Sequence, residues 1–224
     1  MKHLIFRTYL VVVMILISCA QLVSQVQVRE EPFHKPVFEN EYFRILDVWI
    51  QPGDTSLFHI HSTPSLFLYL SDTKVCVEEK GKEWFSDVTK TGYSWYRAFE
   101  TDSIIHRVAN CDTVPLHVTD IELLKMYHPQ ASSPLKHLDQ TLLYENERAF
   151  AYQLTQDDFK KQITTRGPMV AQVTHGQSVL FHNLKKEVSM NLLPGQYVYI
   201  APETSFYFTS TSAGNTGIVM YEIK

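Results

Sequence analysis

The chain has 224 residues, of which 45% are hydrophobic and 20% charged, and its formal net charge is -4. This length allows one large all-β domain or two small domains, and the hydrophobic fraction excludes a disordered chain. The acidic balance and the lack of a long Lys/Arg run give no indication of nucleic-acid binding.

The first 19 residues resemble an export signal. Lys2 and Arg7 precede a short apolar run from Tyr9 to Ile17, which is typical of a signal peptide and too short for a comfortable membrane span. The run ends at Ser18-Cys19, which resembles the bacterial lipobox, and this resemblance implies lipidation of Cys19. The alternative is an ordinary signal peptide cleaved after Ala20. Both alternatives predict an exported protein, periplasmic or anchored to the envelope in a bacterial host.

Landmarks recur in the same order in the two halves of the chain. Glu39-Asn40-Glu41 and Glu145-Asn146-Glu147 each open a strand-like run. Further on, Thr91-Gly92-Tyr93 corresponds to Pro194-Gly195-Gln196. Such a repeat predicts two similar domains, over residues 33–127 and 139–224, and the Pro- and Ser-containing segment 128–138 is interpreted as a linker.

The predicted elements are mostly strands. The runs are short, rich in Val, Ile, Tyr and Phe, and separated by Gly, Pro and Asp, which is typical of an all-β sandwich or barrel. Residues 155–161 could form one turn of helix, but in the repeat they fall where a turn between strands is expected.

His59 and His61 form the clearest chemical pattern. Side chains alternate along a strand, so both imidazoles lie on one face, with Cβ atoms roughly 6–7 Å apart. Two imidazoles at this spacing can converge on one metal ion. A third ligand must come from another strand, and His106 is the candidate.

These residues resemble the motifs of the cupin superfamily. Gly53 is followed after five residues by His59-x-His61, and His106 is followed after three residues by Asn110. The whole chain is similar to bicupins. The resemblance implies two tandem jelly-roll β-barrels, the first holding one divalent transition metal (Fe, Mn, Ni, Cu or Zn) and the second degenerate.

Two departures from the cupin pattern affect the metal site. The glutamate that usually follows the histidine pair is absent, and Ser65 or Leu66 falls there. The second motif is stretched, with Glu100 at the usual glycine. The resemblance therefore implies a three-histidine site, as in cupin dioxygenases, with positions open to substrate and dioxygen. The alternative is a decayed cupin whose histidines only line a polar cavity.

Other residues are weaker candidates. Glu100 could be a substitute ligand or a general base, or only a solvated loop charge. Arg97 could bind a substrate carboxylate, and Tyr69 could face the cavity. The remaining histidines are interpreted as surface or core residues: His3, His34, His117, His128, His137, His175 and His182.

The second half lacks the histidine set. In the repeat, Ile163, Thr165 and Thr209 fall near the positions of the three histidines, so this half is expected to pack against the first barrel or cover its mouth. For Cys76 and Cys111, an exported compartment permits a disulfide, and the alternative is two small semi-buried side chains.

These observations predict a metal-dependent enzyme, oxygenase-like, acting on a small organic molecule. The alternatives are a non-catalytic binding or sensing module of the cell envelope and, with less support, a cupin isomerase or lyase. The expected partner is a small-molecule ligand or substrate. Membrane contact is expected only through the lipid anchor, and an oligomer is compatible with the sequence.

Overall fold

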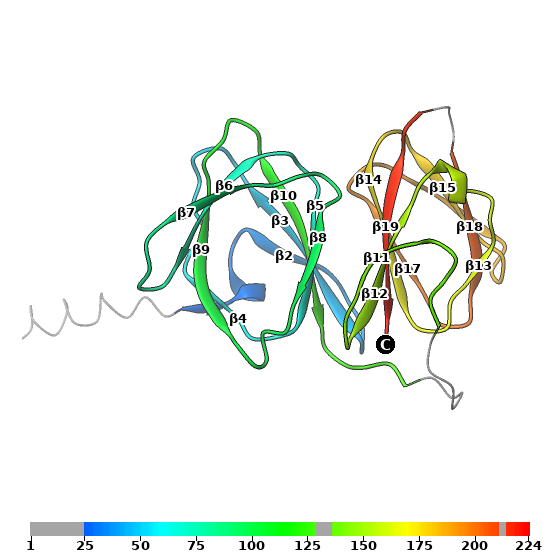
Figure 1. Cartoon of the computed structure of the whole chain (residues 1–224), viewed down its shortest axis with the longest axis horizontal. Helices are drawn as coiled ribbons and strands as arrows, with labels where there is room; N and C mark the ends of the chain where they lie inside the picture. The colour runs from blue at the N-terminus through cyan, green and yellow to red at the C-terminus, as the bar shows by residue number, and fades with distance from the viewer. Residues whose placement is uncertain (1–24, 129–135, 211–213) are drawn as a thin grey trace, which may run out of the picture.

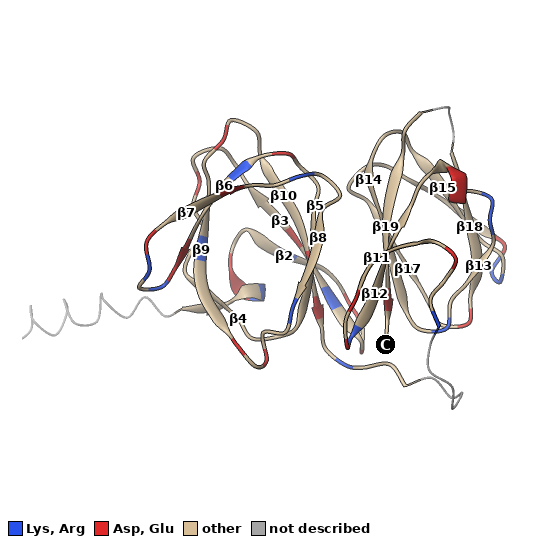
Figure 2. Ribbon diagram, viewed as in Figure 1, with Lys and Arg blue, Asp and Glu red and all other residues tan. Residues whose placement is uncertain are grey.

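A computed structural model describes residues 25–128, 136–210 and 214–224, which fold as two β-barrels side by side (Figure 1). The proposed signal segment with Cys19, and most of the linker, lie outside the described residues. Within the described ranges, no helix is long and apolar enough to cross a membrane. Charges of both signs are interspersed over both barrels (Figure 2).

The first barrel consists of two five-stranded sheets, with strand orders β1-β4-β9-β6-β7 and β2-β3-β10-β5-β8. It begins earlier than residue 33, because β1 pairs with β4 and a 3-10 turn, η1, follows β1. The elements are β1 (Val26–Gln27), η1 (Val28–Glu30), β2 (His34–Glu39), β3 (Phe43–Ile50), β4 (His59–His61), β5 (Ser65–Tyr69), β6 (Lys74–Glu79), β7 (Phe85–Val88), β8 (Ser94–Arg97), β9 (Ile104–Asn110) and β10 (Leu116–Leu123).

The second barrel repeats this arrangement with a five-stranded sheet, β11-β12-β19-β14-β17, and a four-stranded sheet, β13-β18-β15-β16. The expected turn near residue 155 is a 3-10 turn, η2 (Gln156–Asp158), closed by a capping box between Thr155 and Asp158. The strands are β11 (Thr141–Glu145), β12 (Ala149–Leu154), β13 (Ile163–Thr164), β14 (Met169–His175), β15 (Val179–Asn183), β16 (Val188–Leu192), β17 (Tyr197–Ile200), β18 (Ser205–Ser210) and β19 (Gly217–Ile223).

The recurring landmarks are turn residues with the same structural role in each barrel. The Asn40 side chain accepts hydrogen bonds from the backbone N–H groups of Tyr42 and Phe43, at the entry to β3. Asn146 does the same for Arg148 and Ala149, at the entry to β12. Gly92 and Gly195 both adopt φ +85°, a left-handed conformation that favours glycine. The residues that recur in the predicted repeat are therefore those that form equivalent turns in the two barrels.

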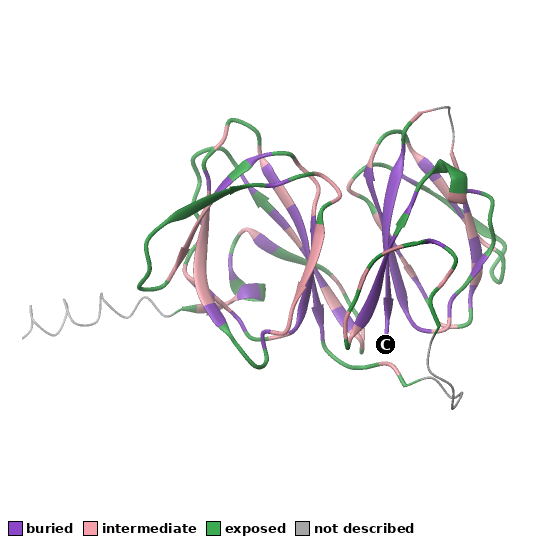
Figure 3. Cartoon of the chain, viewed as in Figure 1, coloured by how far each residue is buried: buried purple, intermediate pink, exposed green. Residues whose placement is uncertain are grey.

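The two barrels pack against each other through one sheet from each. Alternate residues of β3 point inward and outward, so Leu46 belongs to the first barrel's core whereas Ile45 belongs to a cluster shared with the second barrel. That shared cluster also contains Ile121 from the first barrel and Val219 and Tyr221 from the second. Figure 3 shows the consequence, since β12, β14 and β19 are buried along most of their length whereas β7 at the outer edge is exposed.

Cys76 and Cys111 form a disulfide, with Cα atoms 5.9 Å apart. Cys76 lies on β6, and Cys111 directly follows β9. The bond therefore links β6 to the end of β9, its neighbour in the sheet that carries His59, His61 and His106. Of the two alternatives for these cysteines, the structure shows the disulfide and not two separate thiols.

Candidate metal centre

The three motif histidines come together inside the first barrel. β4 carries His59 and His61, and antiparallel pairing with β9 places His106 directly opposite His59. The ring centroid of His106 lies 4.6 Å from that of His59 and 5.0 Å from that of His61. His59 and His61 are 0% and 2% exposed, so they face the interior as the alternation of the strand predicts.

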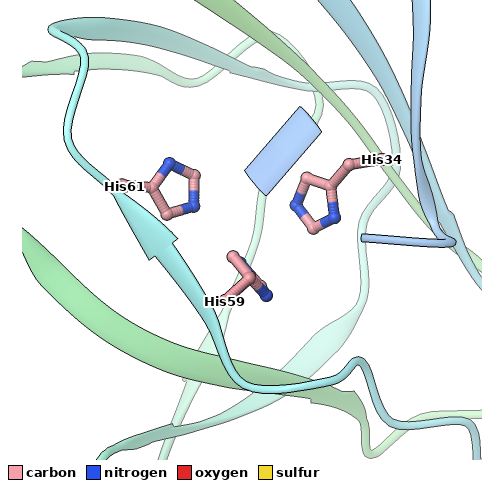
Figure 4. Close-up of side chains that lie close together, drawn as sticks. All are labelled: His34, His59 and His61. Atoms are coloured by element: carbon pink, nitrogen blue, oxygen red, sulfur yellow. The ribbon is translucent and has the colours of Figure 1, made fainter. Parts of the chain in front are cut away.

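A fourth histidine, His34, joins the group from β2 (Figure 4). One ligand atom from each of His34, His59 and His61 lies within 4.8 Å of the others, a spacing at which one metal ion could be bound. His34 is buried and its ring centroid is 4.6 Å from that of His59. It is therefore not an ordinary surface or core histidine. Its signal in the sequence is Glu31, three residues earlier, whose carboxylate accepts a hydrogen bond from His34 Nδ1 at 2.7 Å.

The hydrogen bonds of the rings fix which nitrogens are free. His59 Nδ1 donates to the Leu57 carbonyl at 2.9 Å, and His34 Nδ1 donates to Glu31. His59 Nε2 and His106 Nε2 are buried with no hydrogen-bond partner among the described residues. Metal-binding histidines typically donate their second ring N–H to a carboxylate or a carbonyl, which is the arrangement of His34 and His59.

The rings of His59, His61 and His106 are held in the neutral form that binds metals. Burial and, to a smaller extent, the neighbouring His34 lower the pKa of His59 to about 4. Burial and the nearby His59 lower the pKa of His106 to about 3. Burial and the nearby His106 place the pKa of His61 well below its usual value. Without protons, these nitrogens can offer lone pairs to a cation at neutral pH.

Asp120 is a buried carboxyl group that the sequence interpretation missed. It is 0% exposed on β10, and neither of its oxygens has a hydrogen-bond partner in the described chain. Its Oδ2 lies 3.6 Å from His61 Nδ1, which is also unpartnered. Burial and the nearby Glu122 raise the pKa of Asp120 well above its usual value. Strand β10 carries two buried acidic residues, Asp120 and Glu122, and nothing local in the sequence distinguishes the one beside the histidines from the one paired with Arg44.

A cavity of about 330 Å³ adjoins the histidine cluster. His34, His61, His106 and Asp120 are among the residues that line it. Most of its wall is apolar or aromatic, including Val48, Ile50, Phe67, Val75, Val77, Trp95, Phe99, Ile104, Val108, Leu116 and Val118. Its volume is at the lower end of small-molecule sites. The arrangement offers metal-binding nitrogens beside a compartment that fits an apolar molecule.

The weaker candidates fall in different places. Arg97 and Tyr69 both line the cavity. One guanidinium nitrogen of Arg97 donates to Asp102, an exposed residue, at 2.8 Å. Glu100 is not among the lining residues, and its carboxylate instead pairs with Arg148 of the second barrel at 2.9 Å. This ion pair gives Glu100 a place in the contact between the barrels.

In the second barrel, packed aromatic side chains occupy the place that the histidine cluster has in the first barrel. Ile163 pairs with Phe206 as His59 pairs with His106, so Phe206, and not Thr209, takes the place of His106. Thr209 lies three residues further along β18, and an odd slip along a strand turns a side chain to the other face. Phe206 is 0% exposed and packs with Phe181 and Phe208 in the second barrel's core.

Comparison with solved structures places the chain in the cupin fold. No protein-family model and no curated protein sequence matches the chain. A cupin 2 conserved barrel domain protein from Leptotrichia buccalis superposes with a TM-score of 0.54 at 6% identity, covering 92% of this chain and 94% of that one. AerE from Microcystis aeruginosa gives 0.53 at 10% identity, covering 87% and 98%. A salicylate 1,2-dioxygenase from Pseudaminobacter salicylatoxidans gives 0.54 at 10% identity, covering 81% and 71%. At these identities the likeness shows the fold, and the predicted pair of cupin barrels is confirmed.

Proposed function

We propose that the first barrel is a metal-dependent enzyme of oxygenase type that acts on a small organic molecule. His59, His61 and His106 are the proposed metal ligands, and His34 is the proposed fourth. The observation that carries the proposal is a pair of buried imidazole nitrogens beside an apolar cavity, His59 Nε2 and His106 Nε2, which have no hydrogen-bond partner in the part of the chain that the structure describes. Leaving such groups unpaired is costly, and a bound cation removes that cost.

A divalent transition metal bound there would supply a Lewis-acidic centre with positions open to substrate and dioxygen. The protein's own part is to hold and enclose the substrate. The stacked rings of Phe67 and Trp95, whose centroids are 4.1 Å apart, form one apolar wall of the cavity. Phe99 lies beside Phe67, and Arg97 lies over the Phe99 ring. These walls fit a compact substrate with an aromatic or aliphatic body, and Arg97 could bind its carboxylate.

The salicylate dioxygenase among the structural neighbours acts, by its name, on an aromatic acid. Taken together with the aromatic wall and Arg97, this makes aromatic acids the first compounds to screen as substrates. Export is part of the proposal, and it rests on the N-terminal segment and on the Cys76–Cys111 disulfide, a bond typical of oxidising compartments.

A non-catalytic binding module is the second candidate, and His34 is the observation that favours it. Four histidines around one ion can close a tetrahedral site, as in structural metal centres, whereas a catalytic centre keeps a position free. Cobalt substitution separates the two candidates. An enzyme centre is expected to change its visible spectrum when azide is added, and a closed centre is not.

The first test is the metal content, by mass spectrometry, of the mature protein purified without an affinity tag. We expect about one iron, manganese, nickel, copper or zinc per chain, and its loss in His59→Ala and His106→Ala. His137→Ala is the matched control, because His137 is an exposed histidine near the start of the second barrel and should leave the metal content unchanged. A wild-type protein that holds no metal after reconstitution would overturn the proposal.

A further inference from the structure

Two buried carboxyl groups lie beside Nδ1 atoms of the histidine cluster, Glu31 next to His34 and Asp120 next to His61. Glu31 is 2% exposed and Asp120 is 0% exposed, and neither belongs to the histidine motifs of the first barrel. We infer that these two residues position the histidine ligands of the metal, Glu31 through His34 and Asp120 through His61. This inference rests on the proposed metal site.

Glu31 ties His34 to the segment that leads into β4. Its Oε2 accepts hydrogen bonds from His34 Nδ1 at 2.7 Å and from the Phe33 backbone N–H at 2.8 Å. Its Oε1 accepts from the Leu57 backbone N–H at 3.1 Å, and the Leu57 carbonyl in turn accepts from His59 Nδ1. One carboxylate therefore fixes the orientation of His34 directly and of His59 through Leu57. Because both oxygens already accept from donors, its role is to position ligands.

Asp120 faces His61 in the corresponding way. Its Oδ2 lies 3.6 Å from His61 Nδ1, and neither atom has a hydrogen-bond partner within residues 25–128, 136–210 and 214–224. A small approach of the two groups makes an Nδ1–H···Oδ2 hydrogen bond and leaves Nε2 of His61 to bind the ion. Cation binding places positive charge on the imidazole ring, which strengthens this bond. The carboxyl group of Asp120 thus lowers the stability of the metal-free protein, whereas in the metal-bound protein it would orient His61.

The second barrel provides an internal comparison. Strands β10 and β19 end at equivalent positions, since Leu123 pairs with Phe43 and Ile223 pairs with Ala149. Three residues before these ends, Met220 is therefore the counterpart of Asp120. Met220 is 0% exposed within the apolar core. Two positions later both barrels have a glutamate, Glu122 in the first and Glu222 in the second. Each forms an ion pair with an arginine, Glu122 with Arg44 and Glu222 with Arg166. The carboxyl group at position 120 therefore occurs with the histidines, and the one at position 122 does not depend on them.

The test is zinc affinity, measured by competition with a chromophoric chelator on metal-stripped full-length protein. We expect Asp120→Asn and Glu31→Gln each to weaken zinc binding by about 10- to 100-fold. Glu222→Gln is the matched control, because Glu222 is the buried counterpart of Glu122 in the second barrel and pairs with Arg166, and it should keep the wild-type affinity.

Thermal melting of the metal-free proteins separates positioning from a general structural role. Asp120→Asn should melt no lower than wild type, since it removes a buried acid that has no hydrogen-bond partner among the described residues, whereas Glu222→Gln should melt lower because it breaks the pair with Arg166. Wild-type zinc affinity in both Asp120→Asn and Glu31→Gln would overturn the inference and leave the proposed metal site intact. A wild-type protein that binds no zinc would instead overturn both. Glu31 lies on a different element from Asp120, so the two variants are independent tests if one of them does not fold.

Discussion

His106 on β9 and Phe206 on β18 hold the same position in the two barrels, since His106 pairs with His59 and Phe206 pairs with Ile163. Around His106 the first barrel keeps a cavity of about 330 Å³. Around Phe206 the second barrel has an aromatic core, with ring centroids 5.6 Å from Phe206 to Phe181 and 5.7 Å from Phe206 to Phe208. The same barrel fold thus encloses a cavity beside histidines in the first half of the chain and a packed aromatic core in the second half.

Replacing Phe206 with alanine should therefore act on stability and not on metal binding. Truncation of a fully buried Phe costs about 3–5 kcal/mol, because transfer energy is lost and a cavity remains. Urea denaturation measures this loss. Leu193→Ala, at an exposed position of the same barrel, is the control and should stay within about 0.5 kcal/mol of wild type. A Phe206→Ala variant as stable as Leu193→Ala would show that the second barrel is not packed as described.

The stability of the metal-free protein should decrease as the pH falls from about 6.5 towards 4. Burial lowers the pKa of His59 to about 4 and that of His106 to about 3, from 6.5 in an unfolded chain. Within this window the unfolded chain takes up protons that the folded protein does not, so unfolding is favoured by up to about 1.4 kcal/mol per pH unit for each group. Above pH 6.5 these groups contribute no slope.

Urea unfolding in the presence of a chelator, from pH 7.5 to 4.5, measures this dependence. The control is the double variant His59→Gln/His106→Gln, which should show a flatter profile. The raised pKa of Asp120 acts with the opposite sign, since a buried acid that keeps its proton loses stability as the pH rises. The difference between wild type and the double variant isolates the histidines, and identical slopes would contradict the prediction.

Reduction of the Cys76–Cys111 disulfide should destabilise the first barrel. The two residues are 35 apart in sequence, and closing a loop of that length contributes about 3–4 kcal/mol by limiting the unfolded chain. Urea denaturation with and without a reductant measures the effect. The double variant Cys76→Ala/Cys111→Ala should resemble the reduced wild type and should not respond to the reductant. Equal stability of oxidised and reduced wild type would contradict the prediction.

The part of the site that could be predicted from sequence is the part with a local pattern. His59 and His61 are two residues apart on one strand, so alternation alone places them on one face. His106 was found by its spacing to Asn110, whose amide donates to the Ile50 and Val114 carbonyls and fixes the turn after β9.

His34 and Asp120 have no comparable pattern. They come from β2 and β10, two strands of the opposite sheet, and they reach the cluster only because the barrel closes. Counting along the repeat failed for Thr209 because the second motif of the first barrel carries extra residues before His106. Only the pairing of β13 with β18 fixes the true register, at Phe206.

Arg97 should select substrates that carry a carboxylate. It lines the cavity and lies over the Phe99 ring, 5.2 Å from the centroid, and its known ion pair is with Asp102, which is exposed. An exposed ion pair is weak, so a buried ligand carboxylate can compete for the guanidinium. We expect Arg97→Gln to weaken binding of aromatic carboxylates and to leave binding of their neutral amides unchanged.

Trp95 lines the same cavity, so quenching of tryptophan fluorescence reports occupancy for both ligand series. Arg97→Lys keeps the charge without the bidentate geometry and should fall between wild type and Arg97→Gln. Equal weakening of acids and amides in Arg97→Gln would mean that Arg97 shapes the cavity and does not recognise charge.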